Sequence, residues 1–205
     1  MRSGIVACAV AGLAIAAGAG MAAADDSRVE FGLRAGLNLA SLNGDDASLD
    51  NISPDSRIGF SGGFFVGIRV TPNFLIQPEV LYTQKGAKYD VGGAEFTIKL
   101  DYVEVPVLFK GRFGSGGVKP SVFAGPAVGF KVSGKSAFDG EEEDLEEAKG
   151  TEFGIVFGAG LDLAAGSGAF TIDARYTLGL TTLDDSAVAA DIKNGVWSFS
   201  LGYAF

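Results

Sequence analysis

The chain has 205 residues, enough for one domain, with a formal net charge of −9 and 31 glycines. The excess of acidic residues argues against a nucleic-acid partner, because contacts to a phosphate backbone require a basic surface. Since the chain contains no histidine, Ser-His, Cys-His and Asp-His catalytic pairs are excluded.

The first 24 residues predict a secretory signal peptide. Arg2 supplies a positive charge, residues 5–17 form a short apolar run, and three alanines at 22–24 fit the small-residue cleavage pattern. The apolar run is too short to be a comfortable transmembrane helix. Because Cys8 is the only cysteine and lies in this run, residues 25–205 are expected to form a single exported domain without disulfides.

Large apolar residues alternate with small or polar ones through eight segments, and this period of two predicts β-strands. The segments are 29–39, 58–70, 74–83, 96–109, 121–130, 152–163, 170–180 and 195–205. In the second, Phe65 interrupts the small-residue side. In the fourth, the apolar residues change sides near Leu100 to Tyr102, where we expect a bulge.

The composition of the two sides predicts where the strands lie. One side is Phe, Leu, Val, Ile and Tyr over about nine to eleven residues, the length that a tilted strand needs to cross hydrocarbon. The other side is mostly Gly and Ser with single charged residues, which suits a narrow lumen better than a water-facing coat. The pattern predicts an all-β fold, an eight-stranded antiparallel up-and-down transmembrane β-barrel with outer-membrane lipid around it.

The predicted connections alternate in length. The links at 71–73, 111–118 and 164–168 are short, whereas those at 40–57, 86–95, 132–150 and 181–194 are longer. Since outer-membrane barrels have short periplasmic turns and long outer loops, both termini are expected in the periplasm. The long connections are acidic, above all at 141–147. They carry no D-x-D-x-D-G spacing, so no metal site is predicted, and an unknown extracellular ligand is the alternative to a solvated surface.

Five charged residues on the small-residue side are expected at similar heights above the short links. They are Arg34, Glu79, Glu104, Asp173 and Arg175. We expect them to form one layer in the lumen, with Arg175 pairing with Glu79 across the ring. Because isolated buried charges are costly, a structural plug is the favoured interpretation, and a catalytic or proton-conducting role is the alternative. No catalytic residue and no cofactor are predicted.

Residues 129–136 match the phosphate-binding pattern G-x-x-x-x-G-K-S. That motif requires a loop between a buried strand and the start of a helix. Here Phe130 and Lys131 continue an alternating strand, and the acidic run that follows would repel a nucleotide. The match is therefore interpreted as part of a strand.

Several stretches resemble a known family. They include, in order, FGLRAGLNLASL, LIQPEVLYTQKGAKY, LDYVEVPVLFKGRF, KPSVFAGPAVGF, FGIVFGAGLDL, IDARYTLGL and the final YAF. Over nearly all of 29–205 the chain resembles the PorT-like outer-membrane β-barrels, which are similar in architecture to the small OmpA and OmpX barrels. The resemblance implies that Tyr203 and Phe205 are read by the barrel-assembly machinery. It implies no biochemical activity.

Three functions remain open from the sequence. The favoured one is a non-enzymatic envelope protein with a plugged lumen, in a structural or surface-binding role. The second is a narrow, porin-like channel, which is disfavoured because side chains fill an eight-stranded barrel. The third is an envelope enzyme that uses a pair of carboxylates.

Overall fold

The computed structural model describes residues 28–43, 55–91, 94–138, 141–144, 150–182 and 192–205. The signal peptide predicted at 1–24 lies outside these ranges. The described strands are β1 (Val29–Asn43), β2 (Asp55–Thr71), β3 (Phe74–Val91), β4 (Ala94–Arg112), β5 (Val118–Phe138), β6 (Glu141–Asp144), β7 (Thr151–Ala165), β8 (Gly168–Gly179) and β9 (Lys193–Ala204). No helix in the described residues is long and apolar enough to span a membrane.

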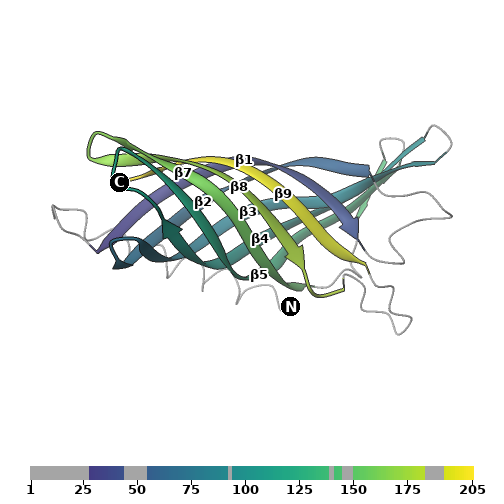
Figure 1. Cartoon of the computed structure of the whole chain (residues 1–205). Coiled ribbons are helices and arrows are strands. Elements are labelled where there is room, and N and C mark those ends of the chain that lie inside the picture. The colour runs from purple at the N-terminus through teal and green to yellow at the C-terminus, as the bar shows by residue number, and fades with distance from the viewer. Residues whose placement is uncertain (1–27, 44–54, 92–93, 139–140, 145–149, 183–191) are drawn as a thin grey trace.

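Eight long strands form a closed antiparallel barrel, as the sequence predicts (Figure 1). Their order is β4-β3-β2-β1-β9-β8-β7-β5, and pairing of β4 with β5 closes the ring. The short strand β6 pairs only with the far end of β5 and stands outside the ring. Closure satisfies the backbone donors and acceptors of every long strand without a free edge.

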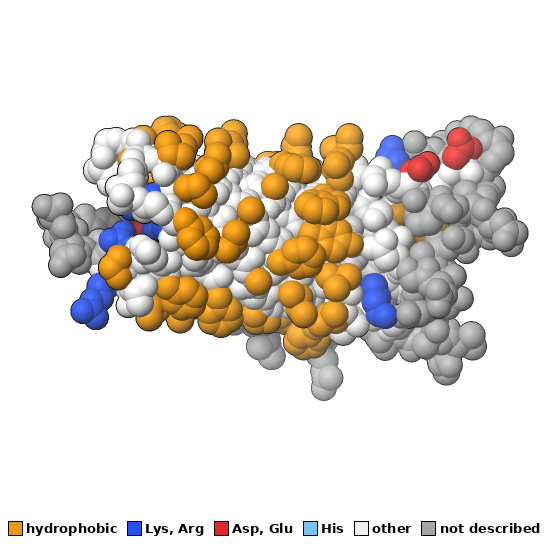
Figure 2. Space-filling view, viewed as in Figure 1, with side chains coloured by type: hydrophobic (Ala, Val, Ile, Leu, Met, Phe, Trp, Pro, Cys, Tyr) orange, Lys and Arg blue, Asp and Glu red, His pale blue; other side chains and the backbone are white. Residues whose placement is uncertain are grey.

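The large apolar side chains cover the outside of the wall, and the small and charged ones line the inside. Leu37, Phe199 and Leu201 are 60%, 52% and 64% exposed, whereas Arg34 is 6% exposed. On the face in Figure 2, hydrophobic side chains occupy the middle of the wall, and charged ones gather towards its two ends. Phe65, the exception in the alternation, is 2% exposed and points into the lumen.

The two ends of the barrel differ in their connections. At one end, β2 and β3 are joined by residues 72–73, β4 and β5 by 113–117, and β7 and β8 by 166–167. We call this the short-turn end. Gly166 has a φ of 62°, a left-handed conformation that favours glycine in so tight a turn.

Two of the predicted long connections are wrong. The link expected at 86–95 is largely strand, because β3 continues to Val91 and β4 begins at Ala94. The loop expected at 132–150 is partly strand too, since β5 continues to Phe138 and pairs with β6. At the end opposite the short turns, backbone pairing continues after the lipid-facing pattern has ended. The β3–β4 and β5–β6 hairpins project beyond the barrel at that end (Figure 1).

The predicted irregularity in the fourth segment exists, but its extra residue lies in the neighbouring strand. Asp101 pairs with Ser133 and Tyr102 with Lys131, so the extra residue is Val132 of β5. Strand β4 keeps its inward parity, with Leu100, Tyr102 and Glu104 all buried. The apolar residues change sides because the lumen itself changes from charged to apolar.

An apolar cluster fills the lumen beyond this change. Leu42, Ala87 and Tyr89 are buried together, and Phe96, Ile98 and Ile192 pack against them. The Tyr89 and Phe96 rings lie 6.2 Å apart. The barrel interior is therefore closed by apolar packing at the end opposite the short turns.

Candidate functional site

Four of the five predicted lumen residues meet in one ion-pair network, the central cluster. Arg34 of β1 lies 3.2 Å from Glu79 of β3 and 2.5 Å from Asp173 of β8. Arg175 of β8 lies 2.8 Å from Glu79 and 3.4 Å from Asp173. Strands β1, β3 and β8 are not neighbours in the ring, so the contacts between them cross the lumen, whereas the contact of Arg175 with Asp173 lies within β8.

The central cluster is buried and balanced in charge. Its two guanidinium groups and two carboxylates are each no more than 5% exposed at the side chain. Gln77 donates a further hydrogen bond to Glu79 at 2.7 Å, and Arg34 and Arg175 lie over the rings of Phe65 and Phe123. Buried charges persist when each has a partner, because an isolated one is expensive.

Glu104, the fifth predicted residue, does not belong to this layer. It lies 2.6 Å from Lys85 of β3, which also contacts Glu152 of β7 at 3.1 Å. These three residues form the Lys85 cluster. The register explains the error, because Glu104 pairs with Leu81 and so stands two residues farther along β3 than Glu79.

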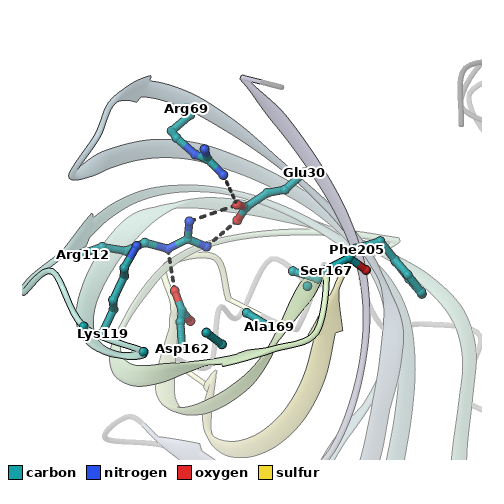
Figure 3. Close-up of a pocket in the computed structure, with 13 residues that line it drawn as sticks. Glu30, Arg69, Arg112, Lys119, Asp162, Ser167, Ala169 and Phe205 are labelled. Atoms are coloured by element: carbon teal, nitrogen blue, oxygen red, sulfur yellow. Dashed lines mark hydrogen bonds and ion pairs between the residues drawn. The ribbon is translucent and has the colours of Figure 1, made fainter. Parts of the chain in front are cut away.

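A third group, the rim cluster, lies near the short-turn end (Figure 3). Arg112 binds both oxygens of Glu30 and also donates to Asp162 from Nε at 2.5 Å. Arg69 contacts Glu30 at 3.2 Å, and Lys110 contacts Asp162 at 2.8 Å. Both carboxylates therefore accept from two cations each.

The residues missed from the sequence extend the same inward alternation. Lys85 follows Glu79 at an even spacing in β3, and Lys110 and Arg112 follow Glu104 in β4. These three residues lie just beyond the predicted segments 74–83 and 96–109, whereas Glu30, Arg69, Glu152 and Asp162 lie inside predicted segments, and only their place in the ion pairs was missed. The described lumen ion pairs join six cations to six carboxylates. They are Arg34, Arg69, Lys85, Lys110, Arg112 and Arg175 with Glu30, Glu79, Glu104, Glu152, Asp162 and Asp173.

Glycine on the inner face makes room for these side chains. Gly160 of β7 pairs with Asp173, and a Cβ built there collides with the Asp173 carboxylate. At Gly67 of β2 a Cβ would lie 2.6 Å from Cγ of Glu30. At these two positions glycine leaves room for a charged side chain of the directly paired strand.

The space left in the middle of the lumen is small. The cavity between the central and Lys85 clusters holds about 20 Å³, roughly one water molecule. Among the described residues no group of three or more His, Cys, Asp or Glu is arranged to hold a metal ion. Residues 129–136 lie in β5, so the phosphate-loop pattern has a strand conformation.

The larger cavity opens at the short-turn end, with a volume of about 350 Å³. It is lined on one side by Glu30, Arg69, Arg112, Lys119 and Asp162. Small residues from the turns and from the last strand complete its wall. It is much larger than the cavity between the central and Lys85 clusters.

The other predicted features are placed as follows. Tyr203 contacts the rings of Phe170 and Phe205 at 5.1 and 5.0 Å, and Phe205 is 58% exposed. Of the acidic connection at 141–147, residues 141–144 form β6, and residues 145–149 lie outside the described ranges.

Comparisons with known proteins agree with this architecture. Residues 20–185 match the family model described as "Outer membrane protein beta-barrel domain". Neisserial surface protein A is 16% identical over 85% of this chain and 97% of its own, with a TM-score of 0.51. This likeness supports the fold and nothing finer.

Two further solved barrels are similar at lower TM-scores. OprG from Pseudomonas aeruginosa is 13% identical over 86% of this chain and 95% of its own, with a TM-score of 0.48. Ail from Yersinia pestis is 21% identical over 86% and 99%, with a TM-score of 0.46. No curated protein matches the chain.

Proposed function

Because the chain belongs to the family of outer-membrane protein β-barrel domains and lies in the bacterial outer membrane, we propose that it is a non-enzymatic barrel with a lumen closed to permeation. One observation carries the proposal: ion pairs cross the lumen at three levels. The rim cluster, the central cluster and the Lys85 cluster follow one another along the barrel. The apolar cluster at Tyr89 lies beyond them.

The connections give the orientation. Outer-membrane barrels carry short turns on the periplasmic side, so the short-turn end and the rim cluster face the periplasm. The apolar cluster and the β3–β4 and β5–β6 hairpins then face the outside. Since the described cavity between the inner clusters is about 20 Å³, it offers no continuous path for a hydrated solute.

The plug predicts that the protein does not conduct. In planar lipid bilayers the wild-type chain should give no steady single-channel steps, because displacing the paired charges from the axis would strand ions in a low-dielectric interior. The measurement is single-channel current at moderate voltage, with a known porin reconstituted in the same way as positive control. Regular steps from the wild type that disappear in Arg175→Ala would establish the channel function instead.

The alternative of a carboxylate enzyme has little room in the lumen. Glu79 is held by two arginines and Gln77, and Glu104 by Lys85, so both are occupied as ion-pair partners. A general acid or base must reach a substrate atom within hydrogen-bond distance. The cavity beside Glu104, about 20 Å³, is too small for a substrate.

We therefore expect Glu79→Gln and Glu104→Gln to leave any lipid or peptide hydrolysis by the purified protein at its wild-type level. The rates are compared per folded molecule, since either change is expected to affect stability. A loss of about 100-fold or more in a variant that still folds would indicate acid–base catalysis and contradict the proposal.

The outward hairpins are the proposed site for any surface-binding role. Strand β5 holds β6 in register from Lys135–Asp144 to Phe138–Glu141, which presents the acidic segment on an ordered edge. Charged edge residues also discourage unwanted strand pairing. The PorT-like resemblance and recognition of Tyr203 and Phe205 by the assembly machinery remain proposals that rest on the sequence motifs.

A further inference from the structure

The cavity at the periplasmic end has a surplus of positive charge. Its lining includes two carboxylates, Glu30 and Asp162, and two cations paired with them, Arg69 and Arg112. Lys119 of β5 adds a third cation to the lining. Among these side chains the formal balance is three minus two, a surplus of one in a chain whose net charge is −9.

The carboxylates are already saturated with donors. Glu30 accepts from Arg112 at both oxygens and from Arg69 at one, and Asp162 accepts from Lys110 and Arg112. Lys119 pairs with Asp162 through the backbone ladder of β5 and β7, but its side chain makes no hydrogen bond or ion pair within the described part of the chain. The cations that remain available to a ligand are therefore Lys119 and the half-exposed Arg69.

The cavity has space in front of these groups. Its volume of about 350 Å³ lies within the usual range of small-ligand sites. A Cβ built on Gly116 meets nothing within 4 Å, so the turn between β4 and β5 leaves that wall open. In Figure 3 Arg69, Arg112 and Lys119 all lie on the same side of the drawn pocket.

We propose that this cavity binds a phosphate group presented from the periplasm. A phosphate monoester carries close to two negative charges and three strong acceptor oxygens, which suit the unpaired ammonium of Lys119 and the half-exposed guanidinium of Arg69. Arg69 supplies a planar fork of donors and Lys119 a mobile ammonium with three. Arg112, fixed by Glu30 and Asp162, holds the floor of the site rigid behind them.

Two sources could present such a group, a soluble phosphate monoester or the headgroup of an inner-leaflet phospholipid. Glycerol 3-phosphate is the soluble probe, titrated by calorimetry into the full chain in uncharged detergent. Phosphatidic acid is the lipid probe, supplied at a small fraction in phosphatidylcholine nanodiscs and followed by phosphorus NMR. Binding of the first alone indicates a soluble ligand, and binding of the second indicates the headgroup.

The variant Arg69→Gln/Lys119→Gln should weaken binding of the responding probe at least about tenfold, since it removes both cations that can donate charge-assisted hydrogen bonds to the phosphate. Lys193→Gln makes the same change of charge at the outer end and should leave the affinity for the probe within about twofold of the wild type. Lys119→Gln alone provides the comparison if the double variant folds poorly. Absence of binding by both probes, or equal affinity in the wild type and Lys119→Gln, overturns the proposal.

Discussion

Replacement of Glu79 by glutamine is expected to lower the free energy of unfolding by about 3–5 kcal/mol. The change keeps the size of the side chain but removes its charge, so that Arg34 and Arg175 face a single carboxylate, Asp173. One buried positive charge is then left without a partner. The loss is read from urea unfolding in lipid vesicles, followed by fluorescence of Trp197, the only tryptophan in the chain.

A second change should recover part of this loss. Glu79→Gln/Arg175→Met removes one charge of each sign and leaves Arg34 with Asp173, a pair at 2.5 Å. The double variant should therefore be more stable than Glu79→Gln alone, although the second change also removes packing against Phe123. If the double variant lost as much free energy of unfolding as Glu79→Gln and Arg175→Met lose separately when added together, the charges would not act as a network.

Arg69→Gln is the matched control for burial. Arg69 also pairs with a lumen carboxylate, but 42% of its side chain is exposed at the rim. Exposed ion pairs contribute about 0.2–1 kcal/mol, so the free energy of unfolding of this control should stay close to that of the wild type. Equal losses for Arg69→Gln and Glu79→Gln would contradict the assignment of the central cluster to a water-excluded lumen.

The sequence predicts the barrel because a period of two is a property of each strand by itself. A strand such as β9 must alternate sides, so Trp197, Phe199 and Leu201 on one side indicate a continuous apolar wall wherever the neighbours lie. The eight-strand count follows from the number of such segments. The faces, the antiparallel order and the closed ring are confirmed by the structure.

The heights of the lumen residues could not be obtained in the same way. Height depends on the register between strands, which the alternation within one strand does not contain. Counting residues from the predicted strand ends placed Glu104 beside Glu79, whereas pairing of Leu81 with Glu104 separates them. Lys85, Lys110 and Arg112 were missed because their strands continue inward-facing alternation past the predicted apolar segments.

The extensions of β3, β4 and β5 were missed for a different physical reason. Beyond the hydrocarbon, a strand no longer has to be apolar outside and small inside, so the pattern used to find strands disappears while backbone pairing persists. In these extensions the inner face carries the apolar residues Tyr89, Phe96 and Ile98, whereas the inner face of the membrane-spanning part carries small and charged residues. The change of environment was therefore interpreted as a change of parity within β4.

The final prediction concerns the outer wall, on which the membrane assignment depends. Phe199 lies near the middle of β9, pairs with Leu37 and Ala174, and is 52% exposed. If hydrocarbon surrounds this position, Phe199→Arg should lower the free energy of unfolding by about 2–4 kcal/mol, because a charge at the midplane of the bilayer has no partner. The measurement is the fraction of folded barrel against urea in lipid vesicles, scored by gel mobility.

Val118→Arg tests whether the cost depends on depth. Val118 is 56% exposed, close to the 52% of Phe199, but it begins β5 at the short-turn end of the barrel, where arginine can reach headgroups and water. The expected loss there is about 0–1 kcal/mol. If both variants lost the same amount, or if the wild type stayed folded and monodisperse in detergent-free buffer, the exposed aromatic wall would not be a lipid-facing surface. A depth-dependent loss is expected because only the lipid environment distinguishes two positions of similar exposure.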